Sequence, residues 1–172
     1  MIFSTFSSLG ISIIFTLINY FLIVVGVLIF HAAFTYSLLL TSLAKINPFI
    51  FFSKMKEAII FAFSTSSSSA TMPVTLKTVE EKLGVDKSVS SFCIPLGTTI
   101  NMDGTAIMQG VATVFIAQVY QVDLSMMEYL MVIITATLAS IGTAGVPGVG
   151  LIMLAMVLQQ VGLPVEGIAL II

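Results

Sequence analysis

Apolar residues run along this chain in long stretches that only short polar segments interrupt. Residues 1–44 contain no Lys, Arg, Asp or Glu, and residues 129–165 are likewise without charge. One apolar run of 26 residues covers 19–44. As a helix rising about 1.5 Å per residue, it is long enough to cross a hydrocarbon core of about 30 Å. The pattern therefore predicts a membrane-spanning helix over 19–44, closed by Lys45 and Pro48. The shorter segment before it, within 1–18, predicts the end of a preceding helix.

Two later segments share a different plan, in which short apolar arms flank a small polar tip. The first covers 49–87 with its tip at 64–73, and the second covers 124–162 with its tip at 140–150. Each arm, at about 15 residues or fewer, is too short to cross the bilayer alone. Irregular backbone at membrane depth is tolerated only where protein covers it or where it lines a wet cavity. We therefore expect two re-entrant helical hairpins, with both tips as candidate sites.

Between the hairpins, residues 88–122 form a long apolar segment in which Asp103 is the only charge. Its centre holds Pro95, Gly97 and Gly104 among several oxygen-bearing side chains. Proline and glycine interrupt helices, so the segment predicts a broken transmembrane helix. The last residues, 163–172, predict the start of a final helix that is cut short.

The composition fits this pattern, with 58% hydrophobic and 8% charged residues. A soluble domain of this size could not bury such runs, and nucleic acid is not a plausible partner. All six basic residues are lysines between 45 and 87, which the positive-inside rule places in the cytoplasm. Beyond Lys87 only acidic charges remain. The hairpins then open from opposite sides, which makes them an inverted repeat in an all-α membrane protein of the plasma or inner membrane.

The interrupted segments carry chemistry for two kinds of ligand. Helix N-termini at the hairpin tips offer N–H groups to an anion such as a carboxylate. Thr99, Asn101 and Asp103 offer hard oxygens, which suit an alkali cation. An anion site beside a cation site indicates coupled transport rather than an enzyme. A serine hydrolase is disfavoured because no G-x-S-x-G motif is present and His31 lies on another helix. One cysteine, Cys93, cannot build a zinc or iron–sulfur site.

Three motifs, in order, are Thr65–Pro73, Asn101–Thr105 and Ala139–Gly148. They resemble the signature stretches of the dicarboxylate/amino acid:cation symporter family, the glutamate transporter homologues. The resemblance covers nearly the whole chain. It implies sodium-coupled symport of an acidic substrate, aspartate, glutamate or a dicarboxylate, or of a small neutral amino acid. It also implies elevator-type alternating access in a homotrimer embedded in the lipid bilayer, with Na⁺ as coupling ion and no organic cofactor.

The same resemblance implies the site residues. Substrate contacts fall on the serine tip, the broken helix and the second tip, at Ser67, Ser68, Thr105, Val146 and Gly150. Sodium ligands, some through backbone carbonyls, fall on Gly97, Thr99, Asn101, Met102, Asp103, Ser140, Ile141 and Thr143.

Two positions distinguish this chain within the resemblance. Gln109 stands where potassium-coupled animal members have a glutamate, which argues against potassium countertransport. Ser66 stands where some microbial members carry an arginine. The family's final helix would begin after Glu166, so the sequence predicts a C-terminal core fragment. An anion-conducting channel and a non-functional fragment are the alternative interpretations.

Overall fold

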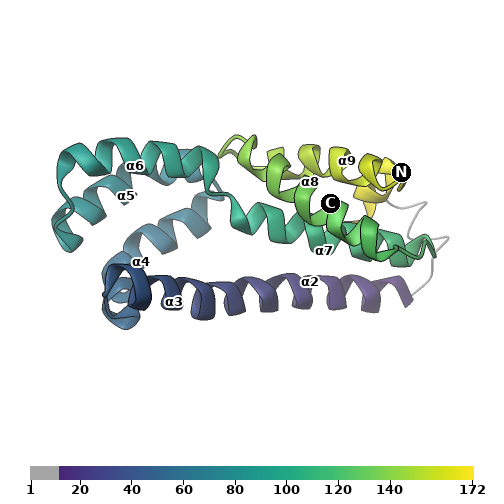
Figure 1. Cartoon of the computed structure of the whole chain (residues 1–172), viewed down its shortest axis with the longest axis horizontal. Helices are drawn as coiled ribbons and strands as arrows, with labels where there is room; N and C mark the ends of the chain where they lie inside the picture. Colours follow the sequence, from purple (N-terminus) through teal and green to yellow (C-terminus); the bar gives the residue numbers. More distant parts are fainter. Residues whose placement is uncertain (1–11) are drawn as a thin grey trace. The chain divides into compact units, whose positions relative to one another are not determined.

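The computed structural model describes residues 12–172, and every regular element in that range is helical. The prediction of an all-α chain is confirmed for these residues. Figure 1 labels the α-helices in chain order. Their bounds are α2 Ser12–Phe30, α3 Ser37–Leu39, α4 Pro48–Thr65, α5 Ser68–Leu83, α6 Lys87–Ile100, α7 Asp103–Val119, α8 Met126–Ile141 and α9 Val149–Gln160. Two π-helical segments, η1 His31–Tyr36 and η2 Leu40–Ala44, and the 3₁₀ segment η3 Val165–Leu170 complete the set.

The long N-terminal helix is built from α2, η1, α3 and η2 without a break. Its stretch Phe15–Ala44 is, by length and composition, the one helix among the described residues long and apolar enough to cross a membrane. The predicted span 19–44 lies inside it. Residues 12–18, which the sequence assigned to a preceding helix, belong to the same helix because one polar residue, Asn19, does not stop it. The remainder of that prediction, residues 1–11, lies outside the described residues.

The helix stops where the backbone at Lys45 turns left-handed, with φ of 54°. The next helix, α4, begins at Pro48, and Asn47 caps it by accepting a hydrogen bond from the N–H of Phe49 at 2.9 Å. Proline fits the first helical position because no intrahelical acceptor is available to its nitrogen there. The lysine and proline that closed the apolar run in the sequence therefore also end one helix and begin the next.

The chain divides into two compact units, and each has its own interior. The first unit combines the described residues up to Ile29 with Asp103–Ser140 and Gly150–Ile172. Helices α8 and α9 lie beside α7 in Figure 1, and their facing side chains make the core. Its buried apolar members are Ala112, Phe115, Ile116, Ala117, Val132, Ala136, Ala139, Leu154, Val157, Leu158, Val161 and Leu163.

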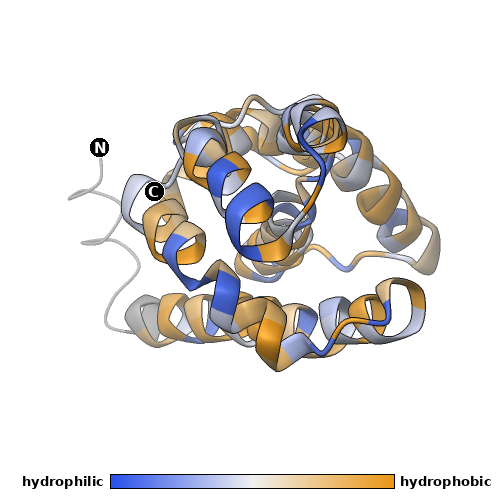
Figure 2. Ribbon diagram, turned by 90° about the vertical axis from the view of Figure 1, so that its left-hand side faces the viewer, coloured by the Kyte–Doolittle hydropathy of each residue, from blue (hydrophilic) through white to orange (hydrophobic). Residues whose placement is uncertain are grey.

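The second unit combines Phe30–Met102 with Ile141–Val149. In this unit α4 and α5 form a helical hairpin, and α6 packs against α5. Hydrophobic positions, orange in Figure 2, recur along all the helices, while hydrophilic stretches are short. Many large apolar side chains are exposed, among them Phe49 at 87% and Phe63 at 88%. Such exposure suits side chains that face lipid or other protein rather than water.

The N-terminus of α8 is closed by a capping box formed by Ser125 and Glu128. The Glu128 carboxylate accepts hydrogen bonds from the N–H and hydroxyl of Ser125 at 2.6 and 2.7 Å. The Ser125 hydroxyl in turn accepts a long bond from the N–H of Glu128 at 3.4 Å. The S-x-x-E spacing produces this reciprocal arrangement at helix starts. The hydrogen bonds from Ser125 lower the pKa of Glu128 below its ordinary value.

A depressed pKa makes the capping box pH-dependent. Its contribution to stability is present above the ordinary carboxyl pKa and is lost as pH falls through the lower pKa of the folded state. We expect Glu128→Gln to remove this part of the acid dependence of the thermal midpoint, measured in detergent between pH 7 and pH 3. The exposed Asp123 is the control, and Asp123→Asn should leave the curve unchanged. Parallel curves for Glu128→Gln and wild type would contradict the prediction.

Candidate functional site

The tip of the first hairpin consists of two residues, Ser66 and Ser67, and is shorter than the expected range 64–73. Ser66 ends α4 in a left-handed conformation, with φ of 47°, and Ser67 is extended, with φ of −140°. The Ser67 hydroxyl caps α5 by accepting a hydrogen bond from the N–H of Ala70 at 3.2 Å. Helix then continues through Pro73, which lies inside α5 at the loss of one backbone hydrogen bond. A run of serines with a proline is typical of a turn, but the Ser67 cap lets a helix form here instead.

Hydroxyl groups beside the tip bond back to the chain. Thr71 is buried and donates its hydroxyl hydrogen bond to the Ser67 carbonyl at 2.7 Å. The Thr65 and Thr71 hydroxyl oxygens lie 3.3 Å apart, within hydrogen-bond distance. These bonds hold the Ser67 backbone in place. Ser68 is different, because it is exposed at the first position of α5.

The second tip joins α8, which ends at Ile141, to α9, which begins at Val149. Gly148 has φ of 84°, a conformation that glycine adopts without strain. Ser140 and Thr143, both predicted sodium ligands, are buried, and the Ser140 hydroxyl donates to the carbonyl of Thr137 at 2.8 Å. The role of both residues as sodium ligands stays a prediction from the sequence.

The two tips meet within the second unit. The carbonyl of Gly145 accepts hydrogen bonds from the Ser67 hydroxyl at 2.8 Å and from the Ser69 N–H at 3.0 Å. The structure thus brings the predicted substrate residues Ser67 and Ser68 to the tip that carries Val146. Gly145 and Ser69 were missed by the sequence analysis. The signal for them was the pairing of two small-residue tips in an inverted repeat, since glycine allows close backbone approach.

Helices α6 and α7 are separated by Asn101 and Met102. The N–H of Asn101 bonds to the carbonyl of Gly97 at 2.9 Å, and the Thr99 hydroxyl donates to the carbonyl of Leu96 at 2.9 Å. The last carbonyls of a helix have no continuing intrahelical donors and carry its negative dipole end. The partly negative carbonyl oxygens at the end of α6 therefore lie in the segment 97–102, which contains the predicted sodium residues.

Asp103 follows directly as the first residue of α7 and is half-buried. A carboxylate at a helix N-terminus is stabilised by the positive dipole end, by about 0.3–1 kcal/mol at exposed positions. Asp103 therefore adds formal negative charge immediately after the α6 carbonyls along the chain. Oxygen groups of this kind suit a hard cation.

In the first unit, α9 begins directly against α7. A Cβ added to Gly150 would lie 3.1 Å from Cγ2 of Thr105 and 3.3 Å from Cε of Met108. The Gln109 side chain, fully buried, donates from Nε2 to the carbonyl of Gly150 at 3.0 Å. The structure thus brings together Thr105 and Gly150, two predicted substrate residues. Met108 and Gln109 were not predicted as contacts of α9, although spacings of three and four residues from Thr105 put them on one helix face.

The predicted site residues divide between the two units. Asp103, Thr105, Ser140 and Gly150 belong to the first, and Ser67, Ser68, Gly97, Thr99, Asn101, Met102, Ile141, Thr143 and Val146 belong to the second. Within each unit the contacts are those described above. The assembly of both groups into one site stays a prediction from the sequence.

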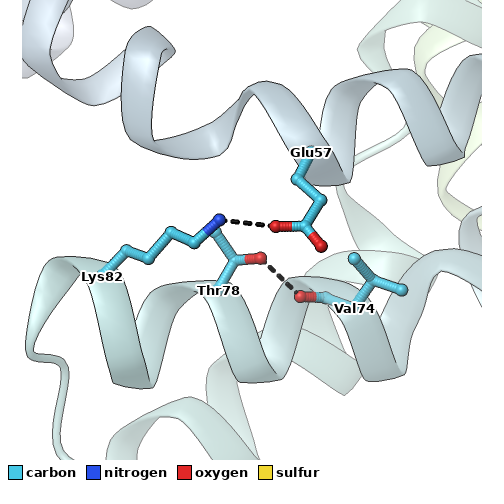
Figure 3. A network of polar contacts seen from close by, with 4 residues as sticks. All are labelled: Glu57, Val74, Thr78 and Lys82. Atoms are coloured by element: carbon cyan, nitrogen blue, oxygen red, sulfur yellow. Dashed lines mark hydrogen bonds and ion pairs between the residues drawn. The ribbon is translucent and has the colours of Figure 1, made fainter.

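The arms of the first hairpin are joined away from the tip by an ion pair. Nζ of Lys82 on α5 lies 2.5 Å from Oε2 of Glu57 on α4. Figure 3 shows the two side chains pointing toward one another. Beside them the buried Thr78 donates its hydroxyl hydrogen bond to the carbonyl of Val74 at 2.7 Å. The paired side chains are 39% and 65% exposed, and an ion pair so open to solvent adds little to stability. It helps to hold the arms together without acting on a ligand.

The start of α6 is capped by Asp86. Its carboxylate accepts hydrogen bonds from the hydroxyl and the N–H of Ser88, and these bonds lower the pKa of Asp86. An ionised N-cap carboxylate at neutral pH favours the helix start. The cap fixes the start of α6 at Lys87, 10 residues before Gly97 along the chain.

Sequence comparison finds one family model that matches residues 1–172, described as the sodium:dicarboxylate symporter family. Excitatory amino acid transporter 1 of Rattus norvegicus is 48% identical over 150 residues, which are 87% of this chain and 27% of that protein. An excitatory amino acid transporter of Caenorhabditis elegans is 46% identical over 153 residues, covering 89% and 30%. Excitatory amino acid transporter 4 of Mus musculus is 46% identical over 153 residues, covering 89% and 27%. The chain spans under a third of the length of these relatives.

Proposed function

The chain belongs to the sodium:dicarboxylate symporter family, and on this basis we propose that it supplies the sodium- and substrate-binding helices of a sodium-coupled symporter for acidic amino acids. The family consists of membrane transporters, so the chain is a membrane protein of a transport family and not an enzyme. Matching relatives are named excitatory amino acid transporters, which favours aspartate or glutamate over a small neutral amino acid as substrate. As in the sequence analysis, we also propose re-entrant hairpins, elevator-type alternating access and a homotrimer.

The observation that carries this proposal is the interruption between α6 and α7. Helix α6, of 14 residues, ends at Ile100, and helix α7, of 17 residues, begins at Asp103. The residues at this interruption carry carbonyl, amide and carboxylate oxygens. Discontinuous helices of this kind in a membrane protein place terminal carbonyls against cations and terminal N–H groups against anions. We propose that Gly97, Asn101 and Asp103 coordinate sodium through carbonyl, amide and carboxylate oxygens.

The remaining predicted sodium residues complete the proposed cation sites from neighbouring backbone and hydroxyl oxygens. They are Thr99, Met102, Ser140, Ile141 and Thr143. Oxygen donors of this kind replace the hydration shell of a hard cation, and a bound cation offsets the cost of holding the Asp103 carboxylate within the membrane.

The proposed substrate site uses the starts of two helices. Ser68 opens α5 and Gly150 lies in the first turn of α9, and each helix start carries the positive end of its own dipole. The Thr105 hydroxyl, next to Gly150, is a third polar group. We propose that these residues and the backbone of Val146 bind the carboxylate and the amino acid backbone of the substrate. The fifth predicted residue, Ser67, has a different role, argued in the next subsection.

Binding measurements test the proposal without transport. Calorimetry on the purified protein should show aspartate or glutamate binding in sodium chloride and at least a tenfold loss of affinity in choline chloride at equal ionic strength. Binding that is equally tight in both salts would contradict sodium coupling. Tight, sodium-dependent binding of serine or alanine with no binding of aspartate would move the substrate class to small neutral amino acids.

The orientation in the membrane makes a separate prediction. All six lysines lie between 45 and 87, so both ends of the first hairpin are expected in the cytoplasm and the 123–128 loop outside. In a Cys93→Ser background, a membrane-impermeant maleimide on intact cells should label Ser125→Cys and leave Lys82→Cys unlabelled. Permeabilised cells, in which both positions should react, are the control. Labelling of residue 82 alone on intact cells would reverse the orientation.

A further inference from the structure

The contact between the tips uses one carbonyl and two donors. The carbonyl of Gly145 accepts the Ser67 hydroxyl hydrogen at 2.8 Å and the Ser69 N–H at 3.0 Å. The Ser69 N–H is one of the first-turn donors of α5 that have no acceptor within their own helix. The second tip thus supplies to α5 an acceptor that the helix itself lacks.

The Ser67 hydroxyl is fully committed in this arrangement. It accepts from the N–H of Ala70 as the helix cap, and it donates its single hydrogen to Gly145. A hydroxyl has one hydrogen, so Ser67 has none left for a substrate carboxylate while the tips are joined. The N–H of the neighbouring Ser68 has no acceptor in the described part of the chain. The open N–H of Ser68 therefore lies beside two occupied donors, the Ser67 hydroxyl and the Ser69 N–H.

The close approach at Gly145 leaves no room for a side chain. A Cβ at this position would lie 2.9 Å from Oγ of Ser69, 3.1 Å from Cβ of Ser68 and 3.1 Å from the Ser69 nitrogen. A side chain at position 145 would therefore require Ser68 and Ser69 to shift, which should weaken the contact between the Gly145 carbonyl and the α5 N-terminus. Both sides of the contact depend on particular residues, a hydroxyl at 67 and no side chain at 145.

We propose that Ser67 and Gly145 form a latch that joins the two hairpin tips, and that Ser67 is a positioning residue for the second tip and does not bind substrate. The bonds of the latch join protein groups alone, the Ser67 hydroxyl and the Ser69 N–H to the Gly145 carbonyl. Ser68 keeps the ligand role. The inference rests on the proposed function in one respect, because it takes the second tip to move when substrate reaches the proposed site at Val146.

Cysteine labelling without substrate tests the latch. In a Cys93→Ser, Val149→Cys background, the rate of reaction with an impermeant maleimide in sodium alone reports opening of the second tip. Ser67→Ala should raise this rate about two- to twelvefold, the factor corresponding to one ordinary hydrogen bond. Gly145→Ala should raise it as well. Ser68→Ala should leave the substrate-free rate unchanged and weaken protection by added aspartate.

Two further variants separate the latch from the helix cap. Ser67→Thr keeps the cap and the donor, so it should label at the wild-type rate. Ser67→Asp keeps a good cap but, when ionised, has no hydrogen to donate to Gly145, so it should label as fast as Ser67→Ala. An unchanged rate in Ser67→Ala, or a wild-type rate in Ser67→Asp, would overturn the latch. If aspartate does not slow maleimide labelling of the Cys93→Ser, Val149→Cys protein that keeps Ser67, the result counts against the proposed function and not against the latch.

Discussion

Replacing Asp103 by asparagine is expected to weaken sodium-dependent substrate binding at least tenfold while leaving the protein folded. Asparagine keeps the shape of the side chain and is accepted at a helix start, but it removes the formal charge that offsets a bound cation. A unit charge at about 4 Å from a cation contributes about 4 kcal/mol at an effective dielectric constant of about 20. A tenfold loss corresponds to about 1.4 kcal/mol, so the prediction asks for only part of that interaction.

Sodium titration of aspartate binding, together with the thermal midpoint measured without sodium, tests this prediction. The matched control is Asp123→Asn, which removes an exposed carboxylate outside the proposed site and should change neither quantity. A structural aspartate would behave differently, because breaking a buried pair costs about 3–5 kcal/mol of stability. An Asp103→Asn protein with a lowered midpoint and unaltered sodium affinity would remove Asp103 from the cation site.

Gln109→Glu is expected to make the contact between α7 and α9 depend on pH. The Gln109 side chain is fully buried and donates to the Gly150 carbonyl, while its Oε1 has no partner within residues 12–172. A protonated glutamate can donate in the same place, but an ionised one cannot and would be buried without compensation. Burial favours the neutral acid, so the pKa of Glu at this position should rise.

The sign of the effect follows from that rise. A carboxyl group whose pKa is raised in the folded state stabilises the protein at low pH relative to high pH, and the stabilisation is lost as pH rises through the raised value. Relative to wild type, the thermal midpoint of Gln109→Glu should therefore fall as the pH rises from 5 to 8.5. The free energy of unfolding should fall by several kcal/mol over the same range. Gln109→Met, of similar size and without charge, is the control and should show no such slope. A Gln109→Glu curve parallel to wild type would contradict the buried contact.

The all-helical architecture could be predicted from the sequence because long hydrophobic runs favour helices, which satisfy their own backbone hydrogen bonds. The 26-residue run at 19–44 lies inside a longer helix in the structure. Boundaries were harder to predict. Asn19 looked like a helix start, but a single amide does not stop a helix, and the π-helical turns at His31–Tyr36 leave no mark in the hydrophobic pattern.

The tips show what composition cannot reveal. A run containing seven hydroxyl residues and a proline predicts a loop, yet the cap at Ser67 starts the helix at Ser68, five residues before Pro73. Capping depends on which serine adopts an extended backbone, and the neighbouring serines are chemically identical. The S-x-x-E sequence at Ser125 and Glu128, by contrast, was a readable signal for the start of α8.

The candidate site was predicted as a set of positions, and the structure adds the contacts within each unit. The sequence indicated that Ser68, Thr105 and Gly150 belong to one site, and the structure places Thr105 against Gly150. The sequence could not indicate that the Gly145 carbonyl contacts Ser67 and Ser69. This contact depends on a close backbone approach between distant parts of the chain, and Ser67 and Gly145 are 78 positions apart.

We propose that this chain forms the binding core of a sodium-coupled symporter for acidic amino acids. The decisive test is uptake of radiolabelled aspartate into proteoliposomes containing the protein, with sodium outside and potassium chloride inside. Uptake should proceed against a concentration gradient, and it should stop when sodium is replaced by choline or when a sodium ionophore collapses the gradient. Uptake that continues unchanged without a sodium gradient, or that only equilibrates aspartate across the membrane as a channel would, contradicts it.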